Sequence, residues 1–199
     1  MRHLMTVAIL ATILAVPALA DEGEFEVLDQ EVLKLAADKA KISARQAIEA
    51  AMREAGEAKL IKVELDLEGD RPVFELGFRT GTGELKIVVD AVSGKVLKQE
   101  REKDAEVEDD AEASEHVLKM INAAKITLTQ AIEAALREVR GGTVVEAEAV
   151  FVFTTVLETK TLGGLRAGDR NEIEWEVELL AGGVFKEIEL DADGRVKEV

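Results

Sequence analysis

The chain of 199 residues contains no cysteine and no tyrosine, and only two histidines and two prolines. Without cysteine there is no disulfide framework and no thiolate zinc site, so stability has to come from packed cores. The three serines, Ser43, Ser93 and Ser114, stand in stretches typical of a helix start, a turn and an acidic spacer, which argues against a Ser-His-Asp arrangement. The sequence therefore predicts a protein that is not an enzyme and that carries no cofactor.

Long apolar runs are also rare, and the one that is present stands at the N-terminus. A basic start is followed by apolar residues 4–16, by Pro17, and by Ala18-Leu19-Ala20 before the first acidic residue, Asp21. This order is typical of a secretory signal peptide. We therefore expect residues 1–20 to be removed on export to the periplasm or the extracellular medium, leaving a mature chain without a membrane span.

Basic residues are scarce in the mature chain. Removal of residues 1–20 leaves 24 Lys and Arg against 41 Asp and Glu, a net charge of −17. Such a chain repels nucleic acid and anionic lipid, and it favours basic partners. The expected partner is a protein with a basic surface, and divalent cations are a second class of ligand.

One segment occurs twice. The sequence AKISARQAIEAAMREA at 40–55 returns after 84 residues as AKITLTQAIEAALREV at 124–139. In each copy a hydroxyl residue stands three positions before a glutamine, Ser43 before Gln46 and Thr127 before Gln130, which is the pattern of a capping box. Apolar residues follow at three-and-four spacing. Each copy therefore predicts an amphipathic helix.

Both copies extend beyond this helix. A shorter helical pattern precedes each one, near 31–36 and 116–121, and alternating apolar and polar residues follow. Strands are predicted over 61–67, 74–78, 85–89 and a short last segment, and again over 143–155, 171–180, 184–190 and the C-terminal residues. A long irregular loop is predicted around 161–169. The short connections elsewhere require an antiparallel meander.

The predicted class is α+β, with helices on one face of the sheet. Two tandem repeats, each a helix-loop-helix packed on a roughly four-stranded antiparallel sheet, are expected at residues 21–99 and 116–199. Residues 100–115 are strongly charged and are predicted to be an acidic linker, helical toward its end.

The repeated helix and the turn that closes the first sheet, Asp90-Ala91-Val92-Ser93-Gly94-Lys95-Val96, resemble the PepSY family. The second turn, Asp191-Ala192-Asp193-Gly194-Arg195-Val196, is one residue shorter. The resemblance implies a small exported α+β module, found in propeptides of thermolysin-type metalloproteases, with inhibition or regulation of peptidases as its role. Two such units in tandem are also similar in architecture to beta-lactamase inhibitory protein.

Glutamates alternate with apolar residues on the predicted last strands. One predicted surface therefore carries Glu172, Glu174, Glu176, Glu178, Glu187 and Glu189, with Glu146 and Glu148 forming a similar pair. Like charges opposite one another across strands are destabilising. We expect this surface to dock a basic protein surface or to collect divalent cations through oxygen ligands. The alternative is that the glutamates only keep the sheet soluble and prevent edge-to-edge aggregation.

Three other features have simpler interpretations. His116, the single histidine after the predicted signal peptide, is expected to be an ordinary surface or helix-boundary residue without a catalytic role. The segment starting at Asp191 resembles the opening of an EF-hand loop, but no glutamate follows at the twelfth position, so a hairpin turn is predicted. Trp175 is expected in the core.

Overall fold

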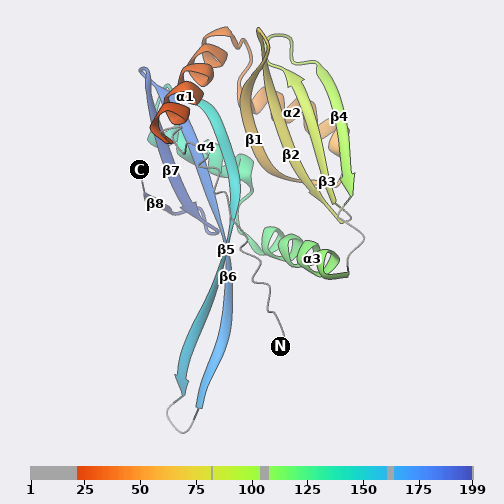
Figure 1. The fold of residues 1–199 in the computed structure, drawn as a ribbon, viewed down its shortest axis with the longest axis vertical. Coiled ribbons are helices and arrows are strands. Elements are labelled where there is room, and N and C mark those ends of the chain that lie inside the picture. Colours follow the sequence, from red (N-terminus) through yellow and green to blue (C-terminus); the bar gives the residue numbers. More distant parts are fainter. Residues whose placement is uncertain (1–21, 82, 104–107, 161–163, 199) are drawn as a thin grey trace, which may run out of the picture.

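The structure is a computed structural model that describes residues 22–81, 83–103, 108–160 and 164–198; the predicted signal peptide lies outside them. The first half comprises α1 (Glu22–Lys39), α2 (Ala44–Ala55), β1 (Lys59–Glu68), β2 (Arg71–Thr80), β3 (Gly83–Asp90) and β4 (Val96–Lys103). The second half comprises α3 (Glu108–Ala123), α4 (Leu128–Glu138), β5 (Thr143–Lys160), β6 (Gly164–Ala181), β7 (Val184–Asp191) and β8 (Val196–Glu198). The predicted α+β class is confirmed (Figure 1).

All of these strands form one continuous antiparallel sheet. The strand order is β4-β3-β2-β1-β5-β6-β7-β8, so each half of the chain contributes one half of the sheet. The two halves meet where β1 pairs with β5, and Val63 lies opposite Ala147 at the centre of this short junction. The two predicted sheets therefore form a single surface.

Capping boxes start α2 and α4, as predicted. The Ser43 hydroxyl accepts a hydrogen bond from the Gln46 backbone N–H (3.4 Å), and the Gln46 side-chain oxygen accepts one from the Ser43 N–H (2.9 Å). Thr127 and Gln130 repeat this exchange at 3.3 and 2.9 Å. Each exchange satisfies two backbone donors that an uncapped helix end would leave unpaired.

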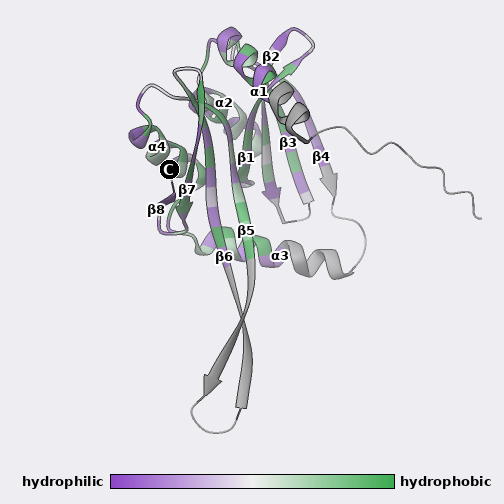
Figure 2. Cartoon of the chain, turned by 60° about the vertical axis from the view of Figure 1, so that its left-hand side comes forward, coloured by the Kyte–Doolittle hydropathy of each residue, from purple (hydrophilic) through white to green (hydrophobic). Residues whose placement is uncertain are grey.

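The main core lies between the sheet and the pair α2 and α4, which pack on the same central strands. On β1, β2, β3, β7 and the part of β6 from Glu172 onward, the alternation that predicted the strands places roughly every second side chain in this core. Alternating hydrophobic and hydrophilic segments are visible along the strands in Figure 2. Its largest fully buried side chains on the strands are Trp175, Phe74, Phe78, Leu65, Leu76, Leu85, Ile87, Leu179, Ile188 and Leu190. Trp175 is 1% exposed, which confirms its place in the core.

Helix α1 lies on the opposite face of the sheet, which differs from the prediction that the helices share one face. In Figure 1, α1 is in front of the sheet while α2 and α4 are behind it. The Lys34 Nζ of α1 lies 5.6 Å from the centre of the Phe185 ring. Phe185 pairs with Leu180, which follows Glu178 by two residues on β6 and therefore lies on the same polar face as the glutamates. Helical periodicity predicted a buried stripe on α1, but it does not specify which face of the sheet covers that stripe.

Two predicted connections are mainly regular structure. The predicted loop around 161–169 is wrong, because β5 continues to Lys160, β6 begins at Gly164, and the two strands pair throughout. They project from the sheet as a two-stranded arm (Figure 1). In the predicted linker 100–115, β4 extends to Lys103 and α3 begins at Glu108. Residues 161–163 and 104–107, which connect these elements, lie outside the described residues.

Candidate functional site: the acidic sheet face

The sheet brings the predicted glutamates together from three neighbouring strands. Strand pairing places Glu146, Glu178 and Glu187 side by side, in line with Glu64 of β1; we call these four residues the Glu64 row. The next row contains Glu148, Glu176 and Glu189, in line with Lys62 of β1; we call it the Lys62 row. Both rows lie on the face opposite α2 and α4, and together with Glu172 and Glu174 they form what we call the acidic face.

Lys62 is the cation of this face next to the junction of the two half-sheets. Its Nζ lies 2.8 Å from a carboxylate oxygen of Glu146, 3.3 Å from one of Glu64 and 3.8 Å from one of Glu148. Burial works against the charge on Lys62, but the hydrogen bond and charge of Glu146, with the charges of Glu64 and Glu148, outweigh it and raise the pKa of Lys62. The lysine therefore stays charged and offsets repulsion where β1 meets β5.

The carboxylates farther from Lys62 are less well compensated. Burial, followed by the charges of Glu187 and Glu148, raises the pKa of Glu176 above its ordinary value. Burial and the charges of Glu146 and Glu187 likewise raise the pKa of Glu178. Both directions are those expected when like charges share a partly desolvated surface. A cation bound at the acidic face would therefore stabilise the folded protein by offsetting this repulsion.

Glu174 and Glu172 lie beyond the two rows along β6. Glu174 is opposite Asp191 of β7, and its Oε2 accepts a hydrogen bond from the Lys197 Nζ at 2.6 Å. Glu172 is exposed and precedes Glu174 by two residues on the same side of β6. The sequence thus identified a single strand face, but the structure divides its residues between the compact rows and this outer end.

Three of the predicted residues could share a cation. Carboxylate oxygens of Glu176, Glu187 and Glu189 lie within 4.8 Å of one another. Hard divalent cations such as calcium prefer carboxylate oxygens. By contrast, the Asp191 segment is a turn, because Asp191 Oδ1 accepts hydrogen bonds from the backbone N–H groups of Asp193 and Arg195, both at 2.9 Å.

Sequence reasoning missed Lys62 as a member of this face. Lys62 and Glu64 alternate with buried residues of β1, and the same signal identified the glutamates of β6. What the sequence did not reveal is that β1 and β5 are neighbours, since non-local strand pairing leaves no local pattern.

The first half of the chain matches a known family. Residues 41–100, from the turn before α2 into β4, match the family model PepSY, described as "Peptidase propeptide and YPEB domain". A PepSY domain is consistent with a regulatory or binding module of the peptidase-propeptide kind, with a non-catalytic role, and with an exported protein. A second PepSY unit at 116–199 stays a prediction.

Comparison with solved structures found a resemblance to a putative lipoprotein from Clostridium difficile 630. The two chains are 19% identical, with a TM-score of 0.44, over 80% of this chain and 93% of the other. No curated protein matches the chain. Among the helices in the described part of the chain, none is both long and apolar enough to span a membrane.

Proposed function

We propose that this protein is an exported, non-enzymatic binding module whose acidic face docks a basic surface of a protein partner, and that the partner is an extracytoplasmic peptidase that it inhibits or regulates. The observation that carries the proposal is the pairing of the Glu64 and Lys62 rows, which gathers carboxylates from β1, β5, β6 and β7 on one side of one sheet. The PepSY domain at 41–100 supports a peptidase as the class of partner.

The electrostatics favour a partner over a purely solubilising role. Glutamates placed only for solubility are best spread apart, because like charges opposite one another cost up to about 1 kcal/mol per cross-strand pair. Here Glu178 lies between Glu146 and Glu187, and Glu176 lies between Glu148 and Glu189. A basic partner would offset this repulsion and would associate faster at low ionic strength.

Affinity capture tests this proposal. Residues 21–199 are immobilised, an extracytoplasmic extract of the host is passed over them at low and high salt, and retained proteins are identified. A retained peptidase that elutes with salt, and that the free protein slows stoichiometrically without being cleaved, is the expected result. Loss of retention in both buffers would contradict the proposal.

A matched pair of variants locates the contact. The acidic-face variant changes Glu176, Glu178, Glu187 and Glu189 to Gln. The control variant changes Asp38 to Asn and Glu54, Glu57 and Glu138 to Gln; all four are exposed residues outside the acidic face, so the two variants lose the same charge. Capture should fail with the first variant and persist with the second.

A second candidate function, a response to divalent cations, is favoured by the convergence of Glu176, Glu187 and Glu189. A cation that binds only the folded state raises the melting temperature. Millimolar calcium should therefore raise the melting temperature of the wild type but not of the Glu187→Gln variant. Melting that is indifferent to calcium, magnesium and manganese would remove this candidate.

A further inference from the structure

Most of β7 forms an open edge of the sheet. Strand β8 pairs with β7 only near its end, and the last pair joins Glu198 to Glu189. Among the described residues, no strand lies on the outer side of Val184–Ile188. A hollow of about 440 Å³ lies along this part of β7, and Phe185 and Glu187 are among the residues that line it.

The turn before β7 determines which of its backbone groups point outward. Gly182 and Gly183 form a two-residue turn with φ values of +60° and +81°, and the residues that flank such a turn bond to each other. Val184 therefore bonds to β6. Because bonding alternates along an antiparallel strand, Phe185 and Glu187 direct their N–H and C=O groups away from β6, toward the open edge.

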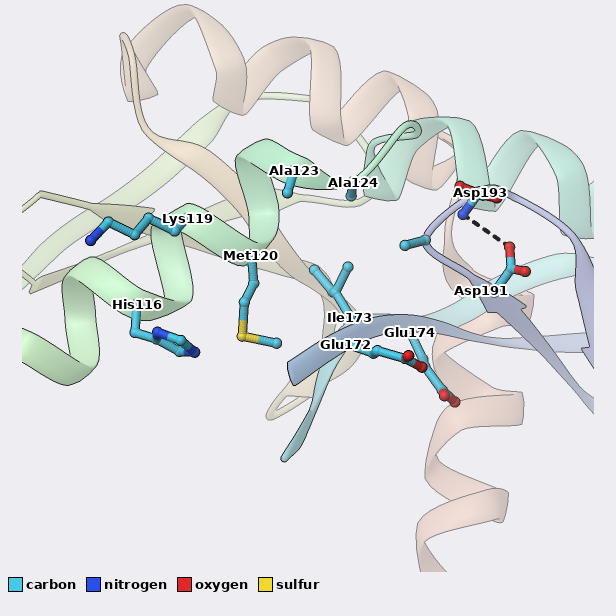
Figure 3. Close-up of a pocket in the computed structure, with 11 residues that line it drawn as sticks. His116, Lys119, Met120, Ala123, Ala124, Glu172, Ile173, Glu174, Asp191 and Asp193 are labelled. Atoms are coloured by element: carbon cyan, nitrogen blue, oxygen red, sulfur yellow. Dashed lines mark hydrogen bonds between the residues drawn. The ribbon is translucent and has the colours of Figure 1, made fainter. Parts of the chain in front are cut away.

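The turn after β7 gives the same direction. The Asp191 N–H donates a hydrogen bond to the Arg195 carbonyl at 2.9 Å, so the odd-numbered residues of β7 face the β8 side. Figure 3 shows Asp191 in this turn, which also borders a pocket between α3 and β6. Within the described residues, no backbone group bonds to the outward groups of Phe185 and Glu187. Unpaired edge groups of this kind can accept an added strand.

The charge at this edge indicates what kind of strand fits. Glu187 is exposed and ends the Glu64 row, and its neighbour in the row, Glu178, is also acidic. No lysine or arginine in the described part of the chain forms an ion pair with Glu187. At the other edge of the sheet, Glu100 of β4 is already paired with Lys98 at 2.8 Å. A basic strand is therefore attracted to β7 in preference to β4.

We propose that an extended segment of the partner adds to the sheet along Val184–Ile188, antiparallel to β7 and in line with β8, with a lysine or arginine opposite Glu187. The segment would bond to the outward N–H and C=O groups of Phe185 and Glu187, and its basic side chain would extend the Glu64 row with a cation. This inference rests on the proposed function, and it names the element by which a basic partner would be held.

The alternation of β7 predicts the other side chains of the segment. Directly opposite residues of an antiparallel pair share a face of the sheet. The residue after the basic one would lie opposite Lys186, which is exposed, so an acidic side chain fits there. The next residue would lie opposite the half-buried Phe185 ring, where an apolar side chain fits. The expected order is therefore basic, acidic, apolar.

The test is an NMR titration of the isotope-labelled mature chain with the probe peptide acetyl-Thr-Lys-Glu-Val-Thr-amide. The backbone N–H signals of Phe185 and Glu187 should shift saturably at millimolar peptide. Their exchange with solvent should slow by at least about tenfold at saturation. The signals of Gln99 and Arg101, on the β4 edge, are the internal control and should not respond.

Two N-methylated forms of the probe peptide test the hydrogen bonds with the wild-type protein. Methylation of its Lys and Val amides removes the donors that would face β7 and should abolish the shifts. Methylation of its Glu and C-terminal Thr amides, which would face away from β7, should leave binding in place.

A charge reversal tests the basic position. Glu187→Lys should bind the probe peptide several-fold more weakly than the wild type does, and it should prefer a peptide with Glu in place of Lys. Glu57→Lys makes the same charge change at an exposed residue outside the acidic face, and it should bind both peptides as the wild type does. The N-methylated peptides decide the question if Glu187→Lys fails to fold.

The outcomes separate this inference from the proposed function. Equal binding of the two N-methylated peptides, equal shifts at both edges of the sheet, or no saturable shift would overturn strand addition at β7. A dimer of the free chain that already protects Phe185 and Glu187 would overturn it too, because the occupant would then be a second copy. Capture of a partner through the acidic face would still stand. Saturable binding at β7 with an empty capture column would retain the edge site and contradict the proposed function.

Discussion

Val63 lies opposite Ala147 where β1 pairs with β5, and the two residues are 84 positions apart in the chain. The repeated helix segments at 40–55 and 124–139 are separated by the same 84 positions. The flanking pairs cross over: Lys62 faces Glu148, and Glu64 faces Glu146. The junction therefore joins corresponding points of the two halves by a local twofold relationship, which extends the Glu64 and Lys62 rows from β5 onto β1.

Lys62 should stabilise this junction more than an ordinary exposed ion pair does. Lys62→Met leaves Glu64, Glu146 and Glu148 facing one another, so we expect a loss of about 1–2 kcal/mol. For a chain of this size, this corresponds to a fall in melting temperature of about 2–8 °C. Thermal unfolding followed by circular dichroism measures it. Lys62→Arg should retain most of the stability, and 1 M salt should shrink the difference; a neutral Lys62→Met would contradict this role.

The raised pKa values of Glu176 and Glu178 predict a pH dependence. Because each carboxyl group binds its proton more tightly in the folded state, the folded state is penalised at pH values above these pKa values. That penalty is relieved as the pH falls through them toward the ordinary glutamate value of 4.5. Glu176→Gln with Glu178→Gln should therefore raise the melting temperature by about 2–4 °C at pH 7.5. The gain over the wild type should shrink as the pH approaches 4.5, and a gain independent of pH would contradict this cause.

A side chain at Gly194, in the turn between β7 and β8, should lower the stability of the protein. Its φ of +82° is unfavourable for other residues, and an added Cβ would come within 3.2 Å of Ile126. Gly69→Ala is the matched control, since φ there is +65° and no atom lies within 4 Å of the added Cβ. Urea unfolding should show a cost of about 1 kcal/mol for Gly69→Ala and a larger one for Gly194→Ala. Equal losses of stability in the two variants would contradict a steric role for the contact between residue 194 and Ile126.

The sequence predicted those features that depend on neighbouring residues, such as helix starts and the two faces of a strand. The capping boxes at Ser43 and Thr127 start α2 and α4, and the alternation around Trp175 placed the glutamates of β6 on one face. The glycines Gly163, Gly164 and Gly168 favoured the prediction of a loop. Gly164 and Gly168 belong to β6 instead, because pairing with β5 overrides the weak preference of glycine for strands.

Long-range relationships could not be predicted in the same way. Nothing in the sequence of α1 indicates that Lys34 would lie over Phe185 on the polar face of the sheet, since the pattern of a helix shows only that it has an apolar stripe. The pocket between α3, β6 and the turn after β7 could not be predicted either, because these three elements are far apart in the sequence. The candidate glutamates were therefore predicted, whereas their cationic neighbours Lys62 and Lys197 were not.

The most direct test of the central claim is the salt dependence of binding between the mature chain and its captured partner, measured by titration from 50 to 300 mM salt for the wild type, the acidic-face variant and the control variant. We expect affinity to fall steeply with salt for the wild type and the control variant, and to be weak and nearly independent of salt for the acidic-face variant, because the removed carboxylates supply the electrostatic attraction. Equal affinities and equal salt slopes for all three proteins would contradict a role for the acidic face in binding.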